Sequence, residues 1–139
     1  MERNGSCLCH KIRFTTSGEP FTFAVCHCIN CKKFSGSAFM ANTFFSPDKV
    51  SVASGREYIR EYQDSDTTSG RTITRSFCVE CGSSLFLSSP QNKDWIVVCA
   101  SSLDDQIQEW VPRRESRPDC KWDWVKELSI QPKTSEGKL

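Results

Sequence analysis

The sequence predicts a small, mainly β protein built from antiparallel strands. Three observations support this fold class: short segments rich in β-branched and aromatic residues recur along the chain, turn-forming residues separate them, and no segment keeps a long apolar period of about 3.6 residues. At 139 residues, the chain has the length of one domain. We expect that domain to span residues 1–130 and a flexible tail to follow at 131–139.

Eight segments fit the strand pattern, and turn-forming residues separate them. The first two flank Ser17-Gly18-Glu19-Pro20, while Ser46-Pro47-Asp48 and Ser54-Gly55 bound the fourth. Only two short stretches, 31–35 and 103–108, permit a helix, so helix is expected to be a minority. The predicted strands, in chain order, are 11–15, 21–25, 38–44, 50–52, 57–62, 72–77, 84–87 and 95–99.

Charge and hydropathy exclude several classes of partner. The 18 basic and 17 acidic residues give a net charge of +1, which does not indicate a nucleic-acid or anionic-membrane surface. No apolar run approaches the roughly 20 residues of a membrane span, and the first residues lack the apolar stretch of a secretory signal. We therefore expect a soluble cytoplasmic protein without nucleic-acid or membrane partners. The final Gly137-Lys138-Leu139 differs by one residue from the Ser-Lys-Leu peroxisomal address, so a peroxisomal location is an alternative.

Seven of the nine cysteines fall in three tight clusters. In a reducing compartment, such clusters indicate metal ligands before disulfides. Residues i and i+2 of an extended segment point to one face, so Cys7 and Cys9 are expected to present two sulfurs to one ion. Cys78 and Cys81 precede Gly82, which is typical of a zinc knuckle in which a tight turn brings two thiolates together.

The clusters can be divided among metal ions in more than one way. The two pairs supply the four thiolates of a closed structural zinc site. Cys26, Cys28 and Cys31, here called the trio, then remain, and a zinc with three protein ligands keeps a fourth position for water or substrate. Spacing also allows Cys28 and Cys31 to pair with Cys78 and Cys81 as a zinc ribbon. Both arrangements predict zinc binding.

The remaining cysteines and the histidines are not expected to be ligands. His10 and His27 follow cysteines, and on a strand each would face away from the neighbouring thiols, as a residue beside the ligands or on the surface. Cys99 ends an apolar strand and is expected to be buried, whereas Cys120 lies among charges and is expected to be a surface thiol. The Arg- and Trp-rich segment after Asp105 is expected to pack across the sheet.

Taken together, the three clusters resemble the glutathione-dependent formaldehyde-activating enzymes, which are grouped with centromere-protein-V-like proteins. The similarity lies in Gly5-Ser6-Cys7-Leu8-Cys9, in CHCINCKKFSGSAF at 26–39, in SFCVECGSSLF at 76–86 and more loosely in 112–122. It covers residues 5–127, nearly the whole domain. Because the first motif cysteine is already residue 7, we expect this chain to differ from the bacterial enzymes, which are associated with a longer N-terminal extension.

The resemblance implies a zinc-stapled fold of layered antiparallel sheets, like that of a zinc protein that chaperones Rab GTPases. It also implies two zinc ions, with ligand sets that agree with the first partition above. The implied activity is carbon–sulfur bond chemistry, in which glutathione condenses with formaldehyde to S-hydroxymethylglutathione or the adduct is cleaved. The implied ligands are Cys7, Cys9, Cys78 and Cys81 for a structural zinc and Cys26, Cys28 and Cys31 for a catalytic zinc.

This chemistry indicates which side chains to expect around the trio. Coordination to zinc deprotonates a thiol whose free pKa is about 8.5. Glutathione carries two carboxylates and one ammonium group, so cationic partners are expected nearby. Lys32 and Lys33 follow the trio directly and are the first candidates for substrate binding, and Arg71 and Arg75 are the second. Asn30 or His27 is a candidate for proton transfer or orientation.

Two other interpretations stay open at this point. The chain could be a zinc-stabilised binding module without catalysis, in which case a fourth protein ligand such as Cys99 or His27 should close the trio. Alternatively, the same zinc chemistry could serve a related lyase that acts on another electrophile in specialised metabolism.

Overall fold

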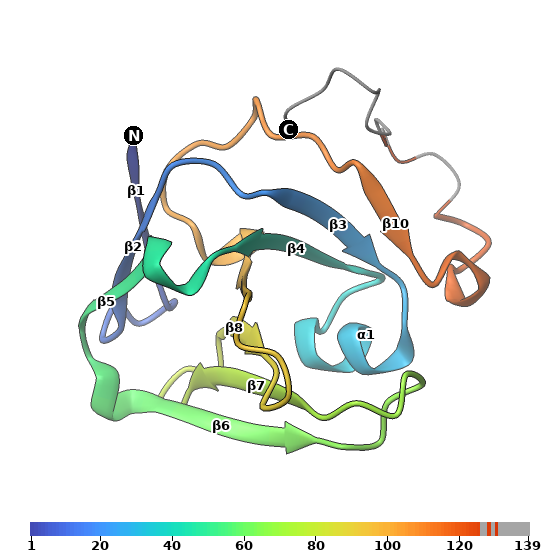
Figure 1. Ribbon diagram of the computed structural model, residues 1–139, viewed down its shortest axis with the longest axis horizontal. Helices are drawn as coiled ribbons and strands as arrows, with labels where there is room; N and C mark the ends of the chain where they lie inside the picture. Colours follow the sequence, from blue (N-terminus) through green and yellow to red (C-terminus); the bar gives the residue numbers. More distant parts are fainter. Residues whose placement is uncertain (126–127, 129, 131–139) are drawn as a thin grey trace.

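The computed structural model describes residues 1–125, 128 and 130 and arranges them mainly in β-strands (Figure 1). The described part of the chain has one α-helix, α1 (Ile29–Ser35), and short 3-10 helices at Pro47–Lys49, Arg56–Tyr58, Ala100–Ser102 and Pro118–Cys120. The strands are β1 (Glu2–Ser6), β2 (Arg13–Ser17), β3 (Thr22–Cys26), β4 (Met40–Phe45), β5 (Val50–Ser54), β6 (Ile59–Asp64), β7 (Ile73–Cys78), β8 (Ser84–Ser88), β9 (Ile96–Cys99) and β10 (Arg114–Ser116).

These strands form two sheets. The smaller has the order β1-β2-β5 and the larger the order β10-β3-β4-β9-β8-β7-β6. Every pairing is antiparallel except that of β10 with β3. Figure 1 shows β3 and β4 on one side of the molecule and β6 and β7 on the other, with α1 between them. The predicted fold class, a mainly β protein of layered antiparallel sheets, is confirmed.

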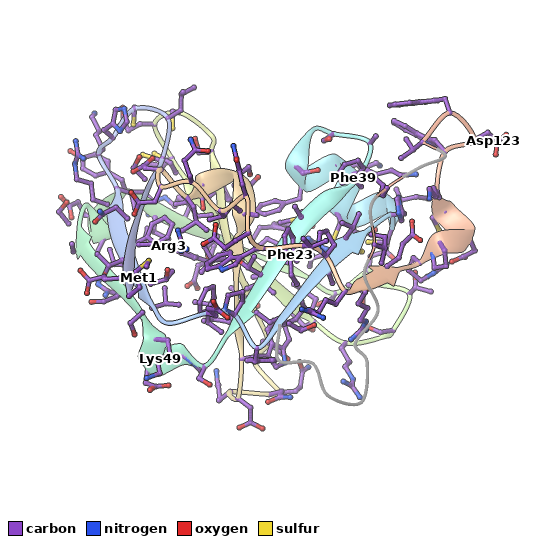
Figure 2. The ribbon with its side chains drawn as sticks, turned by 90° about the horizontal axis from the view of Figure 1, so that it is seen from above. Met1, Arg3, Phe23, Phe39, Lys49 and Asp123 are labelled. Carbon is purple, nitrogen blue, oxygen red and sulfur yellow. The ribbon has the colours of Figure 1, made fainter. Side chains whose placement is uncertain are left out.

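The core joins the two sheets through aromatic side chains. Phe14 of β2 meets Phe86 of β8 edge to face, with ring centroids 5.0 Å apart at 72°. Both rings are buried, and burying a side chain of this size stabilises the fold by roughly 1.5–3 kcal/mol. Trp110, predicted to cover the sheet, is buried against Phe45 at 6.1 Å. In Figure 2, Phe23 lies between the end that holds Met1 and Lys49 and the opposite end at Asp123.

All eight predicted strands are present with shifted ends, and 103–108, one of the two stretches that permit a helix, does not form one. In that segment, the backbone N–H of Asp104 donates to the carbonyl of Asn4 at 2.9 Å, and the Asp105 carboxylate accepts from the N–H of Asn4 at 2.5 Å. Leu103 also bridges to Gly5. The segment is therefore held against β1, a strand that was not predicted, and its backbone groups are unavailable for helical bonding.

Two predictions concern the end of the chain and the membrane. The predicted tail at 131–139, with its final Gly-Lys-Leu, lies outside the described residues. Among the helices that the structure describes, none is long and apolar enough to cross a membrane.

Gly55 sits where the turn after β5 packs on the loop between β1 and β2. Its φ is +79°, and a Cβ atom placed there would lie 1.9 Å from the carbonyl oxygen of Lys11. Gly18 has a similar φ of +74° but open space around it. Both glycines therefore adopt a left-handed backbone conformation, but only Gly55 is also tightly packed against another segment.

We predict that Gly55→Ala destabilises the protein more than Gly18→Ala does. Both substitutions carry the cost of a left-handed backbone, about 1–2 kcal/mol, and only Gly55→Ala adds a collision with backbone at Lys11. The measurement is the free energy of unfolding in urea. Equal losses in the two variants would contradict the close approach of the β5 turn to this loop.

Candidate metal centres

Four cysteine sulfurs gather at the junction of the two sheets. The Sγ atoms of Cys7, Cys9, Cys78 and Cys81, here called the cage, all lie within 4.8 Å of one another. The distance from Cys9 Sγ is 3.5 Å to Cys7 Sγ and 3.8 Å to Cys78 Sγ. A tetrahedral zinc with Zn–S bonds of about 2.3 Å places its sulfurs about 3.8 Å apart. The donor set and its spacing therefore fit a structural zinc.

A tight turn, rather than the extended segment we predicted, brings Cys7 and Cys9 together. The N–H of His10 donates to the carbonyl of Cys7 at 2.9 Å, and His10 has a φ of +61°. The N–H of Ile12 donates to Cys7 Sγ at 3.3 Å. His10 consequently lies in this turn, where its Nδ1 is 3.1 Å from the hydroxyl of Ser6, and it is not a member of the cage.

The second pair forms the knuckle that the sequence predicted. Gly82 has a φ of +74°, and its N–H donates to the carbonyl of Cys78 at 2.8 Å, which closes the turn. The Ser83 hydroxyl lies 3.1 Å from Cys81 Sγ. Burial opposes ionisation of Cys81, but the bonds from the side chain and backbone of Ser83 outweigh it and lower the pKa of Cys81 to about 6.

The trio lies at the start of α1. Cys26 is the last residue of β3, Cys28 is the N-cap of α1, and Cys31 lies in its first turn. The Cys31 N–H donates to Cys28 Sγ at 3.3 Å, so a thiol takes the capping role that an oxygen usually has. The three sulfurs lie within 4.8 Å of one another, and Cys78 and Cys81 belong to the cage instead. The zinc-ribbon arrangement is therefore not the one the structure contains.

Three thiols this close cannot all ionise unaided. Hydrogen bonds from Cys26 and Cys31 lower the pKa of Cys28 to about 2, while hydrogen bonding to Cys28 raises that of Cys26. The pKa of Cys31 is raised, chiefly by its side-chain bond with Cys26. A divalent cation removes the conflict because it stabilises all three thiolates together. The soft, closely spaced donors of the trio thus also fit zinc.

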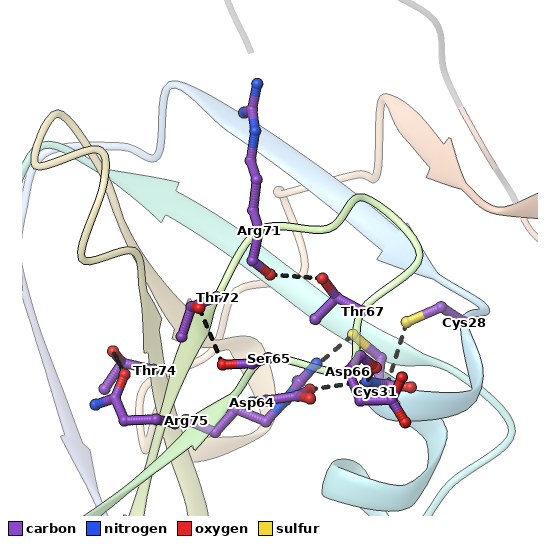
Figure 3. Close-up of polar contacts among 12 residues, drawn as sticks. Cys28, Cys31, Asp64, Ser65, Asp66, Thr67, Arg71, Thr72, Thr74 and Arg75 are labelled. Carbon is purple, nitrogen blue, oxygen red and sulfur yellow. Dashed lines mark hydrogen bonds and ion pairs between the residues drawn. The ribbon is translucent and has the colours of Figure 1, made fainter.

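A buried arginine adds positive charge beside the trio (Figure 3). Arg75 Nε donates to Asp64 Oδ2 at 2.8 Å, and its Nη1 lies 3.9 Å from Cys31 Sγ. Burial disfavours the charged guanidinium, but the Asp64 bond and the Cys31 sulfur outweigh it and raise the pKa of Arg75. Asn30 Nδ2 donates to the same Asp64 oxygen at 2.9 Å. Asn30, a candidate for proton transfer, thus helps to hold this ion pair.

A cavity of about 430 Å³ opens onto the trio. Its size is within the range of small-molecule sites. Ile73 and Leu87 give it an apolar side, and the loop between β6 and β7 contributes 67–69. Arg114 and Arg117 from the C-terminal segment also line it. Neither arginine was predicted as a site residue, and only the Arg-rich composition of that segment hinted at a role.

The predicted lysine contacts lie elsewhere. Lys32 Nζ donates to the carbonyl of Cys120 and sits 4.5 Å from the centroid of the Trp122 ring. Lys33 lines a separate cavity of about 790 Å³ that reaches the cage at Cys81. Arg71 is exposed, and in Figure 3 its side chain points away from the trio sulfurs. Among the four predicted cations, Arg75 alone lines the trio cavity.

The two residues considered as a fourth ligand have other environments. His27 is completely buried rather than on the surface, and its Nε2 is 2.7 Å from Glu115 Oε1. Cys99 is buried, as predicted, and does not join the trio. The Cys120 thiol, predicted at the surface, is half-buried, with Arg117 Nη2 at 3.5 Å.

The chain is similar to known proteins in sequence and in fold. A putative glutathione-dependent formaldehyde-activating enzyme of Halomonas elongata is 30% identical over 125 residues, which cover 87% of this chain and 78% of the relative. An uncharacterised lyase of Schizosaccharomyces pombe is 27% identical over 135 residues, covering 93% and 90%. The crystal structure of a Rhodobacter sphaeroides protein shares the fold, with a TM-score of 0.59 and 17% identity over 78% of this chain and 93% of that one.

A family model adds the decisive match. The model described as glutathione-dependent formaldehyde-activating enzyme matches residues 2–121, a span that contains the cage, the trio and the arginines of the C-terminal segment. Because this family model covers most of the described chain, the protein belongs to the family of glutathione-dependent formaldehyde-activating enzymes.

Proposed function

We propose that the protein is a zinc-dependent carbon–sulfur lyase or synthase that makes and cleaves the bond between the glutathione sulfur and the carbon of formaldehyde. The observation that carries this proposal is the trio. Its three sulfurs converge, no fourth protein ligand joins them in the described residues, and they face a cavity of suitable size for a small molecule. The family match and the names of both relatives support the same class of activity.

Two zinc ions are proposed, one in the cage and one at the trio. The cage would hold a structural ion with four thiolates. At the trio, zinc would supply positive charge and a fourth coordination position, which favour a substrate thiol in its thiolate form at neutral pH.

The chain itself would hold and orient the reactants. Cys26, Cys28 and Cys31 fix the position of the metal, and Arg75 offsets part of their negative charge. Ile73 and Leu87 exclude water from one side of the cavity. In the condensation, the sulfur forms a bond to the carbonyl carbon and the π electrons of the carbonyl move to its oxygen. The proton released by the thiol balances the proton taken up by that oxygen, so the reaction needs no redox partner.

The proposal also includes the predicted lysine contacts and the predicted compartment. Lys32 and Lys33 stay candidate contacts only for a substrate that extends beyond the cavity, because neither lines it. The cytoplasm is the proposed compartment, since thiolate ligands persist where disulfides do not form. A binding module without catalysis and a lyase for another electrophile are outcomes of the test below.

We predict that the zinc-loaded protein accelerates exchange between formaldehyde and S-hydroxymethylglutathione, measured by NMR exchange spectroscopy. Cys28→Ser should lose this acceleration and one of the two zinc ions per chain, because serine does not replace a thiolate ligand. Circular dichroism should show the same fold in both proteins. Exchange at the uncatalysed rate with wild-type protein would contradict the formaldehyde reaction, and loss of both zinc ions from Cys28→Ser would contradict separate centres.

We also predict that Arg75→Lys weakens zinc binding at the trio and spares the cage. Lysine keeps the charge but lacks the planar fork that reaches Asp64 and Cys31 together. Loss of a group that supports metal ligands typically costs about 10- to 100-fold in metal affinity. Competition with a chromogenic chelator measures this change, and Arg71→Lys is the matched control. If Arg75→Lys binds both zinc ions with the wild-type affinity, Arg75 has no part in the metal centre.

A further inference from the structure

The C-terminal segment runs beside the strand that delivers Cys26. β10 pairs in parallel with β3, with Arg114 opposite Ala24 and Ser116 opposite Cys26. The N–H of His27 then donates to the carbonyl of Ser116 at 3.0 Å. Residues 114–116 are therefore fixed next to the trio by backbone hydrogen bonds, although they lie far from it in sequence.

One face of β10 anchors the strand. Glu115 Oε1 is 2.7 Å from Nε2 of the buried His27 and 3.0 Å from Lys121 Nζ. Hydrogen bonds and charge from Lys121 and then His27 lower the pKa of Glu115 despite its burial. Since successive strand side chains point to opposite faces, Arg114 is left on the other face of β10, where it lines the trio cavity. The contacts of Glu115 thus hold Arg114 at the cavity.

Arg117 is held at the same cavity by a strained backbone and a fixed side chain. Its φ of 52° and ψ of 56° are left-handed, which is uncommon for a residue other than glycine. Its Nε and Nη2 donate to the two oxygens of Asp119 at 2.9 and 2.7 Å. Nη1 keeps its donors, with no hydrogen-bond partner in the part of the chain that the structure describes. The guanidinium is therefore oriented before any ligand arrives.

The cavity carries positive charge that no acidic side chain among the described residues fully neutralises. Three arginines line it, and no Asp or Glu is among the described lining residues. Arg75 is committed to Asp64 and Cys31, and Arg117 is paired with Asp119 through Nε and Nη2. Arg114 is exposed and has no side-chain hydrogen bond or ion pair within the described residues. A guanidinium in this situation offers paired N–H donors that match a carboxylate.

We propose that Arg114 and Arg117 form a carboxylate-binding pair that selects acidic thiols for the trio. This inference rests on the proposed function, because it assumes that a thiol sulfur reaches the trio. The substrate class is a small thiol with a carboxylate placed away from its sulfur. The sulfur lies toward Cys26, Cys28 and Cys31, and the carboxylate toward the two arginines. Arg114 supplies the free guanidinium, and Arg117 supplies Nη1 from a fixed position.

Binding measurements with ester-matched ligands test this inference without relying on turnover. Zinc-loaded wild-type protein is titrated calorimetrically with glutathione and its diethyl ester, and with 3-mercaptopropionate and its methyl ester. Each ester keeps the thiol and removes carboxylate charge. We expect each acid to bind about tenfold more tightly than its ester, since one charge-assisted hydrogen bond has this effect. Arg114→Gln and Arg117→Gln should each reduce this preference several-fold, and Arg114→Lys should reduce it less.

Arg13→Gln is the matched control, because Arg13 is an exposed strand arginine on the smaller sheet. It should keep the wild-type preference. Zinc content and circular dichroism check that each variant is folded and loaded. Equal affinity for acid and ester in wild type would overturn the inference. An Arg114→Gln variant that loses affinity equally for acid and ester would also overturn it, because this pattern indicates a structural role.

The outcomes for binding and for the reaction are separable. If formaldehyde exchange is absent but the ester preference is present and depends on Arg114, carboxylate recognition holds and the proposed reaction fails. If exchange is present and the ester preference is absent, the reaction holds and carboxylate recognition fails.

Discussion

The convergence of four thiols from two distant parts of the chain is the constraint on which the rest of the structure depends. Cys9 and Cys78 are 69 residues apart, and their sulfurs lie 3.8 Å from each other. Cys7 and Cys9 lie in the loop between β1 and β2, whereas Cys78 ends β7 of the larger sheet. The cage therefore ties the two sheets together in a chain with a modest apolar content of 37%.

The cage also positions the trio through the strands on either side of the knuckle. Arg75 is three residues before Cys78 on β7, and its guanidinium reaches Asp64 and Cys31. After the knuckle, the Ser84 hydroxyl donates to the carbonyl of Phe34 in α1 at 2.6 Å. The helix that carries Cys31 is thus contacted by β7, which precedes the knuckle, and by β8, which follows it. The cage and the trio are therefore linked through β7 and α1.

Local sequence patterns predicted much of the fold. They failed for segments whose structure depends on contacts with distant parts of the chain. The eight apolar strands were predictable because β-branched and aromatic residues stand between clear turn signals. β1 and β10 have the sequences ERNGS and RES, which are too polar to signal a strand. β10 pairs with β3 through its backbone, and Glu115 adds contacts with His27 and Lys121. The cysteines of each cluster are close in sequence and were therefore found. Arg114 and Arg117 reach the trio cavity only because β10 pairs with β3.

In the proposed function, the protein supplies all four ligands of the cage zinc, whereas the trio zinc has a position open to a thiol. Zinc K-edge X-ray absorption on the two-zinc protein measures the average number of sulfur neighbours per ion. We predict a value between three and four that rises to four when glutathione is added, because only the trio gains a ligand. A value of four before glutathione is added, or no change on its addition, would contradict it.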